Sequence, residues 1–103
     1  KKDLNLLENS LEKIKNLNGY KYKRTDLSDN DKIHIGVIAQ EVEKDFPELI
    51  TERIKDNKIL KGVNYNGLIP ILIESVKELS LKIEVLEKNN KDLENKLKLL
   101  DIS

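Results

Sequence analysis

The sequence predicts an α+β protein, mainly helical, in which a small head with short β-hairpins precedes a long C-terminal helix that self-associates as a coiled coil. Three observations predict this architecture. The last third of the chain carries an apolar heptad stripe, the first two thirds carry short periodic segments between turn signals, and only 38% of the 103 residues are hydrophobic. A chain this short and polar buries a thin core, so association between chains is expected to add stability.

The heptad stripe is the clearest pattern in the chain. Its members alternate at spacings of four and three residues, and they are Leu72, Val76, Leu79, Ile83, Leu86, Asn90, Leu93, Leu97 and Leu100. A helix over residues 67–100 would be on the order of 50 Å long, and few other residues remain to cover its stripe. We therefore expect a head over residues 1–66 and a coiled-coil helix over residues 67–103, within one domain overall.

Asn90 interrupts the stripe at an a position of the heptad. A polar residue there costs stability but rejects slipped registers, so Asn90 is predicted to set the register of the coiled coil. The alternative is that the seam frays at this point, beside Asn89. β-branched residues at a with Leu at d favour two strands, so the stripe by itself leans towards a dimer.

The start of the long helix differs from the rest, because residues 68–76 are apolar nearly all round. Such a segment is expected to be enclosed by the head. Pro70 fits near a helix start, where its missing N–H costs little, and Asn64 or Asn66 is the expected N-cap.

The remaining elements are short. The stripe of Leu4, Leu7, Leu11, Ile14 and Leu17 predicts a first helix, which Asn18 and Gly19 end. Residues 20–22 and 33–37 alternate like strands around a polar loop at 24–32. A helix is expected over residues 39–45, closed before Pro47, and a β-hairpin over residues 49–53 and 59–63.

Composition excludes several functions. The 19 basic and 19 acidic residues balance, which argues against a bulk electrostatic grip on nucleic acid or on an anionic membrane. The long helix has no basic extension like that of a DNA-binding zipper, and the chain has no apolar run of about 20 residues and no signal peptide. With no Cys, one His, no EF-hand spacing and no Gly-rich phosphate loop, neither a metal nor a cofactor is expected.

One stretch is not explained by periodicity. Residues 34–42 read His-Ile-Gly-Val-Ile-Ala-Gln-Glu-Val, residues 46–50 read Phe-Pro-Glu-Leu-Ile, and residues 63–65 read Val-Asn-Tyr. Together with the trailing heptads, this combination closely resembles the intramolecular chaperone auto-processing domain. That domain stands at the C-terminus of phage endosialidases, tailspikes and tail fibres, and within the myelin regulatory factor of animals. The resemblance covers nearly the whole chain.

The resemblance implies a homotrimer that templates folding of the preceding part of its own polypeptide and then releases itself through a Ser–Lys dyad. On this ground we expect the long helix to form a parallel trimeric coiled coil, against the weak dimer preference of the a and d residues. The family's domain opens with a pattern close to Ser-Asp-x-Arg-Leu-Lys. Lys1 is the best match to the dyad lysine, with Lys2 next if the register slips by one. The Ser would then lie five positions upstream of Lys1. The printed sequence starts on Lys rather than Met, so we expect a fragment or processed product that is inactive by itself. For a viral relative, the domain would act in the host cytoplasm during virion assembly and leave the mature appendage.

The proposed dyad has a clear chemical requirement. A Ser hydroxyl becomes a good nucleophile when a neighbouring base removes its proton, and a lysine does this only when neutral. Its pKa must then fall from about 10.4 towards neutrality, through burial or a neighbouring cation. A loose terminal lysine is simply solvated, whereas packing by the other chains of a trimer would exclude water. We therefore hypothesise that assembly gates cleavage, which a monomeric variant that still cleaves would disprove.

The motif residues have two interpretations. His34 either orients the dyad or polarises the scissile carbonyl, or it is a hydrogen-bonded structural histidine. Gly36 is expected to allow a close backbone approach, Gln40 and Glu41 to serve the start of a short helix, and Tyr65 to pack under the long helix.

Two functions from different classes remain. The first is a self-cleaving trimeric chaperone without a cofactor, and the second is a non-catalytic module that holds chains in register. A Ser at the first position of the upstream Ser-Asp-x-Arg-Leu-Lys pattern would support the first function, and another residue there would support the second.

Overall fold

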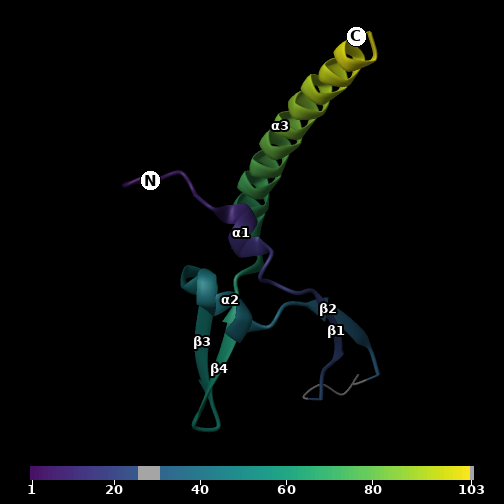
Figure 1. Cartoon of the computed structure of the whole chain (residues 1–103). Helices are drawn as coiled ribbons and strands as arrows, with labels where there is room; N and C mark the ends of the chain where they lie inside the picture. Colours follow the sequence, from purple (N-terminus) through teal and green to yellow (C-terminus); the bar gives the residue numbers. More distant parts are fainter. Residues whose placement is uncertain (26–30, 103) are drawn as a thin grey trace.

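The computed structural model describes residues 1–25 and 31–102, the side chain of residue 102 excepted, as an extended α+β chain of 77 × 41 × 19 Å. The head lies at one end, and α3 (Leu68–Ile102) extends away from it (Figure 1). The predicted α+β class is confirmed, with two β-hairpins and one long C-terminal helix, whereas association of α3 as a coiled coil stays a prediction. Most of the polar loop predicted over residues 24–32 falls on residues 26–30, which lie outside the described residues.

The first hairpin pairs β1 (Tyr20–Lys23) with β2 (Ile33–Gly36) in antiparallel register, with Tyr20 opposite Gly36. Side chains alternate between the two faces of a strand. Tyr22 and His34 are therefore neighbours on one face, and Lys21 and Ile35 are neighbours on the other.

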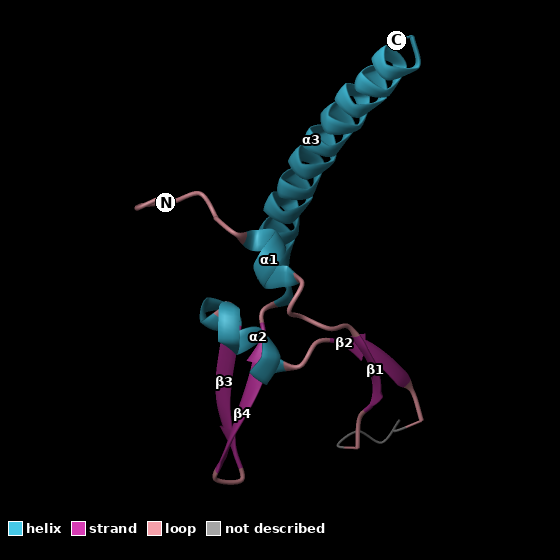
Figure 2. Cartoon of the chain, viewed as in Figure 1, coloured by secondary structure: helices cyan, strands magenta, loops and turns pink. Residues whose placement is uncertain are grey.

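The second hairpin pairs β3 (Ile50–Lys55) with β4 (Lys58–Val63). Asp56 and Asn57 join them with φ of 53° and 61°, the left-handed backbone that a two-residue hairpin turn requires. Both strands are longer than predicted, and Figure 2 shows this hairpin apart from the first.

Two predicted helix boundaries match the structure. The helix α2 (Ala39–Asp45) ends before Phe46, because the residue preceding a proline avoids helical angles, and Pro47 opens the 3₁₀ turn η1 (Pro47–Leu49). A second 3₁₀ turn, η2 (Tyr65–Gly67), leads into α3, where Pro70 is the third residue. The predicted N-cap of α3 is not seen, since the Asn64 side chain makes no capping hydrogen bond and Asn66 lies within η2.

The first helix is much shorter than the predicted 4–17. The helix α1 (Ser10–Ile14) begins after Asn9, whose φ of 56° breaks the helical path. The preceding residues 1–9 form an exposed arm in which Leu4 is 79% and Leu7 42% exposed. The N–H of Leu11 donates to Glu78 Oε2 at 2.8 Å, so a carboxylate from α3 satisfies the start of α1.

The core joins the head to the first turns of α3. Val42, Phe46 and Ile71 are buried together. Half-buried apolar side chains surround them, from α1 and the segment after it, the connection from β2 to α2, η1, the base of the second hairpin and the start of α3. These are Ile14, Leu17, Val37, Leu49, Ile50, Val63 and Leu68.

The expectation that residues 68–76 are enclosed on all sides is wrong for the single chain. Of the residues on the first two turns of α3, Ile71 and Ser75 are buried. Ile69, Leu72, Ile73 and Val76 are 48–63% exposed, because the small head reaches one face of α3.

Candidate functional site

The heptad stripe of α3 is uncovered in the single chain. Its apolar members from Leu72 to Leu97 are 46–63% exposed, and all described side chains from residue 79 to residue 101 are exposed. Asn90 lies on the same exposed stripe. An α-helix 35 residues long with one continuous apolar seam can hold another copy of itself along about 50 Å.

His34 lies in β2 and stacks on Tyr22 of β1, with 5.5 Å between the ring centroids. Its Nε2 is buried and has no hydrogen-bond partner among the described residues. One interpretation of His34 is a structural histidine held by hydrogen bonds, but Nε2 makes none with the described residues. The contact that positions the ring is the stacking on Tyr22.

Gly36 ends β2 and is in close contact with Tyr65. A Cβ built on Gly36 would lie 2.5 Å from the Tyr65 hydroxyl oxygen and 3.2 Å from Tyr22 Cε1. The N–H of Val37 donates to the same hydroxyl at 3.1 Å. Tyr65 is 48% exposed in the single chain, and its hydroxyl supports the connection from β2 to α2. Packing of Tyr65 under the long helix stays a prediction.

Glu41, on the first turn of α2, fastens that helix to β1. Its carboxylate accepts from the Tyr20 hydroxyl at 2.8 Å and from Asn18 Nδ2 at 3.3 Å. The bond to Glu41 keeps the phenol protonated and, with some burial and the negative charge of Glu41, raises the pKa of Tyr20 above 10.0. Gln40 beside it is exposed, and the side chains of α2 supply no N-cap bond.

Lys1 and His34 are not brought together in one chain. Lys1 and Lys2 are exposed on the arm, whose end lies on the opposite side of the molecule from β1 and β2 (Figure 1). Ser10 is 1% exposed at the start of α1, where it is part of the packing against α3. A Ser–Lys pair is thus not assembled from the described residues of a single chain.

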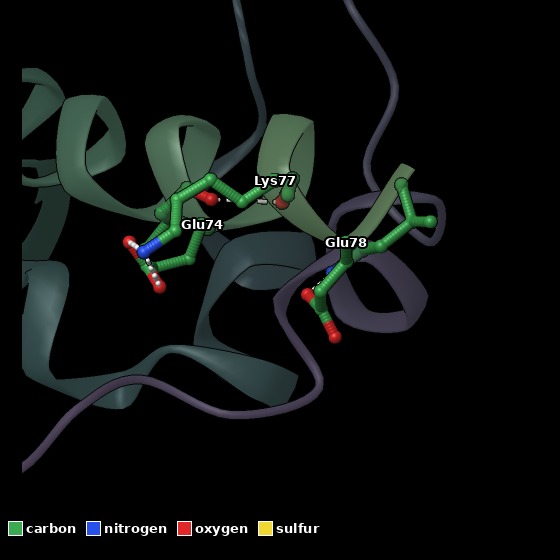
Figure 3. Close-up of polar contacts among 6 residues, drawn as sticks. Glu74, Lys77 and Glu78 are labelled. Carbon is green, nitrogen blue, oxygen red and sulfur yellow. Dashed lines mark hydrogen bonds and ion pairs between the residues drawn. The ribbon is translucent and has the colours of Figure 1, made fainter. Parts of the chain in front are cut away.

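Glu78 is a residue that sequence reasoning missed. It lies beside Glu74 and Lys77, which form their own pair with Lys77 Nζ 3.1 Å from both Glu74 carboxylate oxygens (Figure 3). Glu78 instead turns to α1 and accepts from the Leu11 N–H. The two residues are 67 positions apart, so local sequence pattern carries no signal for this contact.

Neither a metal-binding cluster nor a membrane-spanning helix is present among the described residues. Groups of three or more His, Asp or Glu side chains that could hold a metal ion are absent from residues 1–25 and 31–102. Across the same ranges, α3 included, the structure contains no helix with the length and apolar character needed to cross a membrane.

The fold and these surfaces define a class of protein: a small α+β head on a long helix whose heptad stripe is exposed in the single chain. Residues 1–51 match the family model described as chaperone of endosialidase. This match spans the arm, both strands of the first hairpin and α2. Residues 1–51 belong to that family, and the predicted resemblance is confirmed over these residues.

The chain is also similar to phage long tail fiber proteins Gp37. It is 36% identical over 85 residues to that of Enterobacteria phage K3, 40% over 83 residues to that of Escherichia phage AR1, and 30% over 105 residues to that of Salmonella phage S16. These alignments cover 79%, 76% and 97% of this chain but 7%, 7% and 14% of the relatives. The chain therefore spans a small part of the length of the proteins it resembles.

Proposed function

We propose that this chain is a C-terminal intramolecular chaperone that brings three copies of a tail-fibre polypeptide together and directs folding of the preceding part. The observation that carries the proposal is the uncovered heptad stripe of α3, which is attached to a head of the endosialidase-chaperone family. Long fibrous chains must find the same register in every copy before they fold. A seam with one polar position, Asn90, supplies a register that a uniformly apolar seam lacks.

The stoichiometry of three rests on the family rather than on the seam residues. Val76 and Ile83 at a with Leu at d favour two strands. Light scattering over a dilution series decides between these numbers. We expect a mass of about 36 kDa for three copies of 11.9 kDa, constant on dilution. A stable mass of about 24 kDa would refute the trimer.

A matched pair of variants tests whether the seam holds the copies together. Ile83 and Val85 are both β-branched and are 46% and 52% exposed, but only Ile83 belongs to the heptad stripe. Ile83→Asp should dissociate the assembly towards the mass of one chain, and Val85→Asp should leave it intact. Equal loss of mass in both variants would contradict the proposed seam.

We further propose that the parent polypeptide cleaves itself with a Ser–Lys dyad, in which Lys1 is the base. The Ser hydroxyl attacks a peptide carbonyl carbon and passes its proton to the neutral lysine amine, which then protonates the departing nitrogen. Water hydrolyses the resulting ester and restores the Ser. Lys1 needs a drier setting than the exposed arm of one chain, and contact with other copies would supply it.

A chain extended upstream with the Ser-Asp-x-Arg-Leu pattern tests this step by gel electrophoresis. Lys1→Ala should abolish cleavage and Lys2→Ala should retain it. Ile83→Asp should also prevent cleavage if assembly is required. Cleavage by a monomer would overturn the gating, and a trimer that never cuts would support the second candidate, a non-catalytic registration module. The exposed position of Lys1, away from β2, favours that second candidate.

A further inference from the structure

The helix α3 carries a second regular stripe besides the heptad seam. Ile71 and Ser75 are buried against the head, Glu78 accepts from the Leu11 N–H, and Lys82 Nζ lies 3.5 Å from Glu12 Oε1. These positions follow one another at spacings of four, three and four residues, so they form one face of α3 that contacts α1 and the core. Val85 is the next position on this face, and it is 52% exposed.

Residues 6–9 of the arm lie beside α3 near the uncovered end of this face, and the N-terminal end of the arm leads away from the helix (Figure 1). Residues 6–9 and residues 74–84 of α3 line an open groove of about 670 Å³. Leu4, Leu6 and Leu7 of the arm are 42–79% exposed, and Leu81, beside Val85 on α3, is 61% exposed. Apolar side chains from both walls of the groove therefore face solvent.

The helix α1 runs antiparallel to α3. Ile14 packs on the core beside Ile71, Leu11 meets Glu78, and Glu12 pairs with Lys82. Both helices rise about 1.5 Å per residue. If α1 continued backwards through the arm, Leu7 would be level with Lys82 and Leu4 with Val85. The helical stripe of Leu4, Leu7 and Leu11 would then lie along the apolar end of the second face of α3.

Two features keep α1 from continuing. Asn9 has a left-handed backbone with φ of 56°, which a helix cannot include, and Asn tolerates that region better than most residues. The Leu11 N–H donates to the Glu78 carboxylate, whereas in a longer helix it would donate to the carbonyl of Leu7. The same N–H therefore has two competing acceptors, one on α3 and one on the arm.

We propose that the arm is a strap with two positions: the open one seen here, and a closed one in which residues 4–9 extend α1 and place Leu4 and Leu7 on Leu81 and Val85. Asn9 and Glu78 hold the open position. Closure transfers the Leu11 N–H from the Glu78 carboxylate to the Leu7 carbonyl and covers the groove. The inference depends on contacts within one chain and stands whether or not the chain trimerises. Under the proposed function, closure would also bring the start of the arm, which carries Lys1, closer to α3.

The test is to remove both features that hold the strap open, in the full 103-residue chain. In the double variant Asn9→Ala with Glu78→Ala, NMR should show helical ¹³Cα shifts for residues 4–9. Amide exchange at residues 8–10 should slow by about tenfold or more relative to the natural sequence. Arm amides that still exchange at unstructured-chain rates would overturn the proposal.

Three further variants separate docking from simple helix propensity. Adding Leu81→Asp and Val85→Asp to the double variant should return the arm to fast exchange, whereas adding Leu99→Asp should not. Leu99 is 67% exposed on α3, far along the helix from the groove. If the arm amides stay protected after Leu81→Asp and Val85→Asp are added, docking of the arm on α3 is refuted. Signals from Val42 and Phe46 report that the core is intact.

A milder comparison covers the case in which the double variant unfolds. Gly adopts the left-handed region without penalty and Ala avoids it. Protection of the arm amides from exchange should therefore be greatest in Asn9→Ala and lower in the natural chain. In Asn9→Gly it should be equal to or lower than in the natural chain. The reverse order would overturn the proposal.

Discussion

Replacing Ile71 and Ile73 in turn by Ala tests how the head grips α3. The two residues are of the same type and stand two positions apart on one helix. Ile71 is 4% exposed in the core with Val42 and Phe46, whereas Ile73 is 54% exposed. The sequence alone, apolar nearly all round in this segment, predicts that both are enclosed, and the structure predicts that only Ile71 is.

The expected costs differ severalfold. Truncating a buried Ile to Ala removes transfer free energy and leaves a cavity, at about 2–5 kcal/mol. Such a loss is a large part of the roughly 5–15 kcal/mol by which small domains are stable. At Ile73 less than half of the side chain is covered, which limits the loss to about 1 kcal/mol. The better helix propensity of Ala returns about 0.4 kcal/mol at either site.

The assay is urea unfolding followed by circular dichroism. With a slope of about 1.5 kcal/mol/M, a 3 kcal/mol loss at Ile71 lowers the midpoint by about 2 M, and Ile73→Ala lowers it by less than about 0.5 M. Both variants are measured at two protein concentrations tenfold apart, because assembly links stability to concentration. Equal losses that do not change with concentration would refute the one-sided packing of α3.

Three other predictions each concern one residue. Asn90→Ile should raise the thermal midpoint of the assembly, because the seam gains apolar area. It should also broaden the mass distribution in light scattering, because the seam loses the polar residue that sets its register. An unchanged mass distribution would contradict the register role of Asn90. Gly36→Ala should cost about 1–3 kcal/mol in urea unfolding, because its Cβ would meet the Tyr65 hydroxyl, and Tyr65→Phe should restore part of that loss. The pKa of Tyr20 is raised by its bond to Glu41, so this bond stabilises the fold below pH 10.0 and is lost as the phenol ionises above it. Unfolding midpoints of the natural chain and Tyr20→Phe should differ at pH 8 and converge above pH 10, and a constant difference would argue against the bond.

Elements with local causes were predictable from the sequence. The bounds of α2 follow from Pro47, which sets the backbone of Phe46 before it. The tight turn between β3 and β4 follows from Asp56 and Asn57, two residue types that tolerate positive φ. The length of α3 follows from an unbroken periodicity with no Gly or Pro beyond Pro70.

The sequence misled where a distant partner decides the local structure. The arm has the periodicity of a helix, but Glu78 takes the N–H that would continue it. Tyr65 is half exposed in the single chain, where its hydroxyl accepts from the backbone of Val37, a contact that the local sequence pattern does not signal. The candidate catalytic site was even less predictable. Lys1 and His34 lie on different parts of the single chain, and the sequence motif around each residue does not determine whether the two come together.

Both misjudged segments share one physical feature with the heptad seam. Four apolar residues of the segment 68–76 and the leucines of residues 4–7 are exposed in the single chain, so each segment carries apolar surface that the head does not cover. Ile69, Leu72 and Val76 fall in line with the a and d positions of the seam, and another copy of α3 would cover them. Leu4 and Leu7 belong to the arm rather than to α3, so pairing of the α3 seams does not by itself cover them. The excess apolar residues of this polar chain therefore divide into a set that needs a second copy and a set that the chain can bury against its own α3.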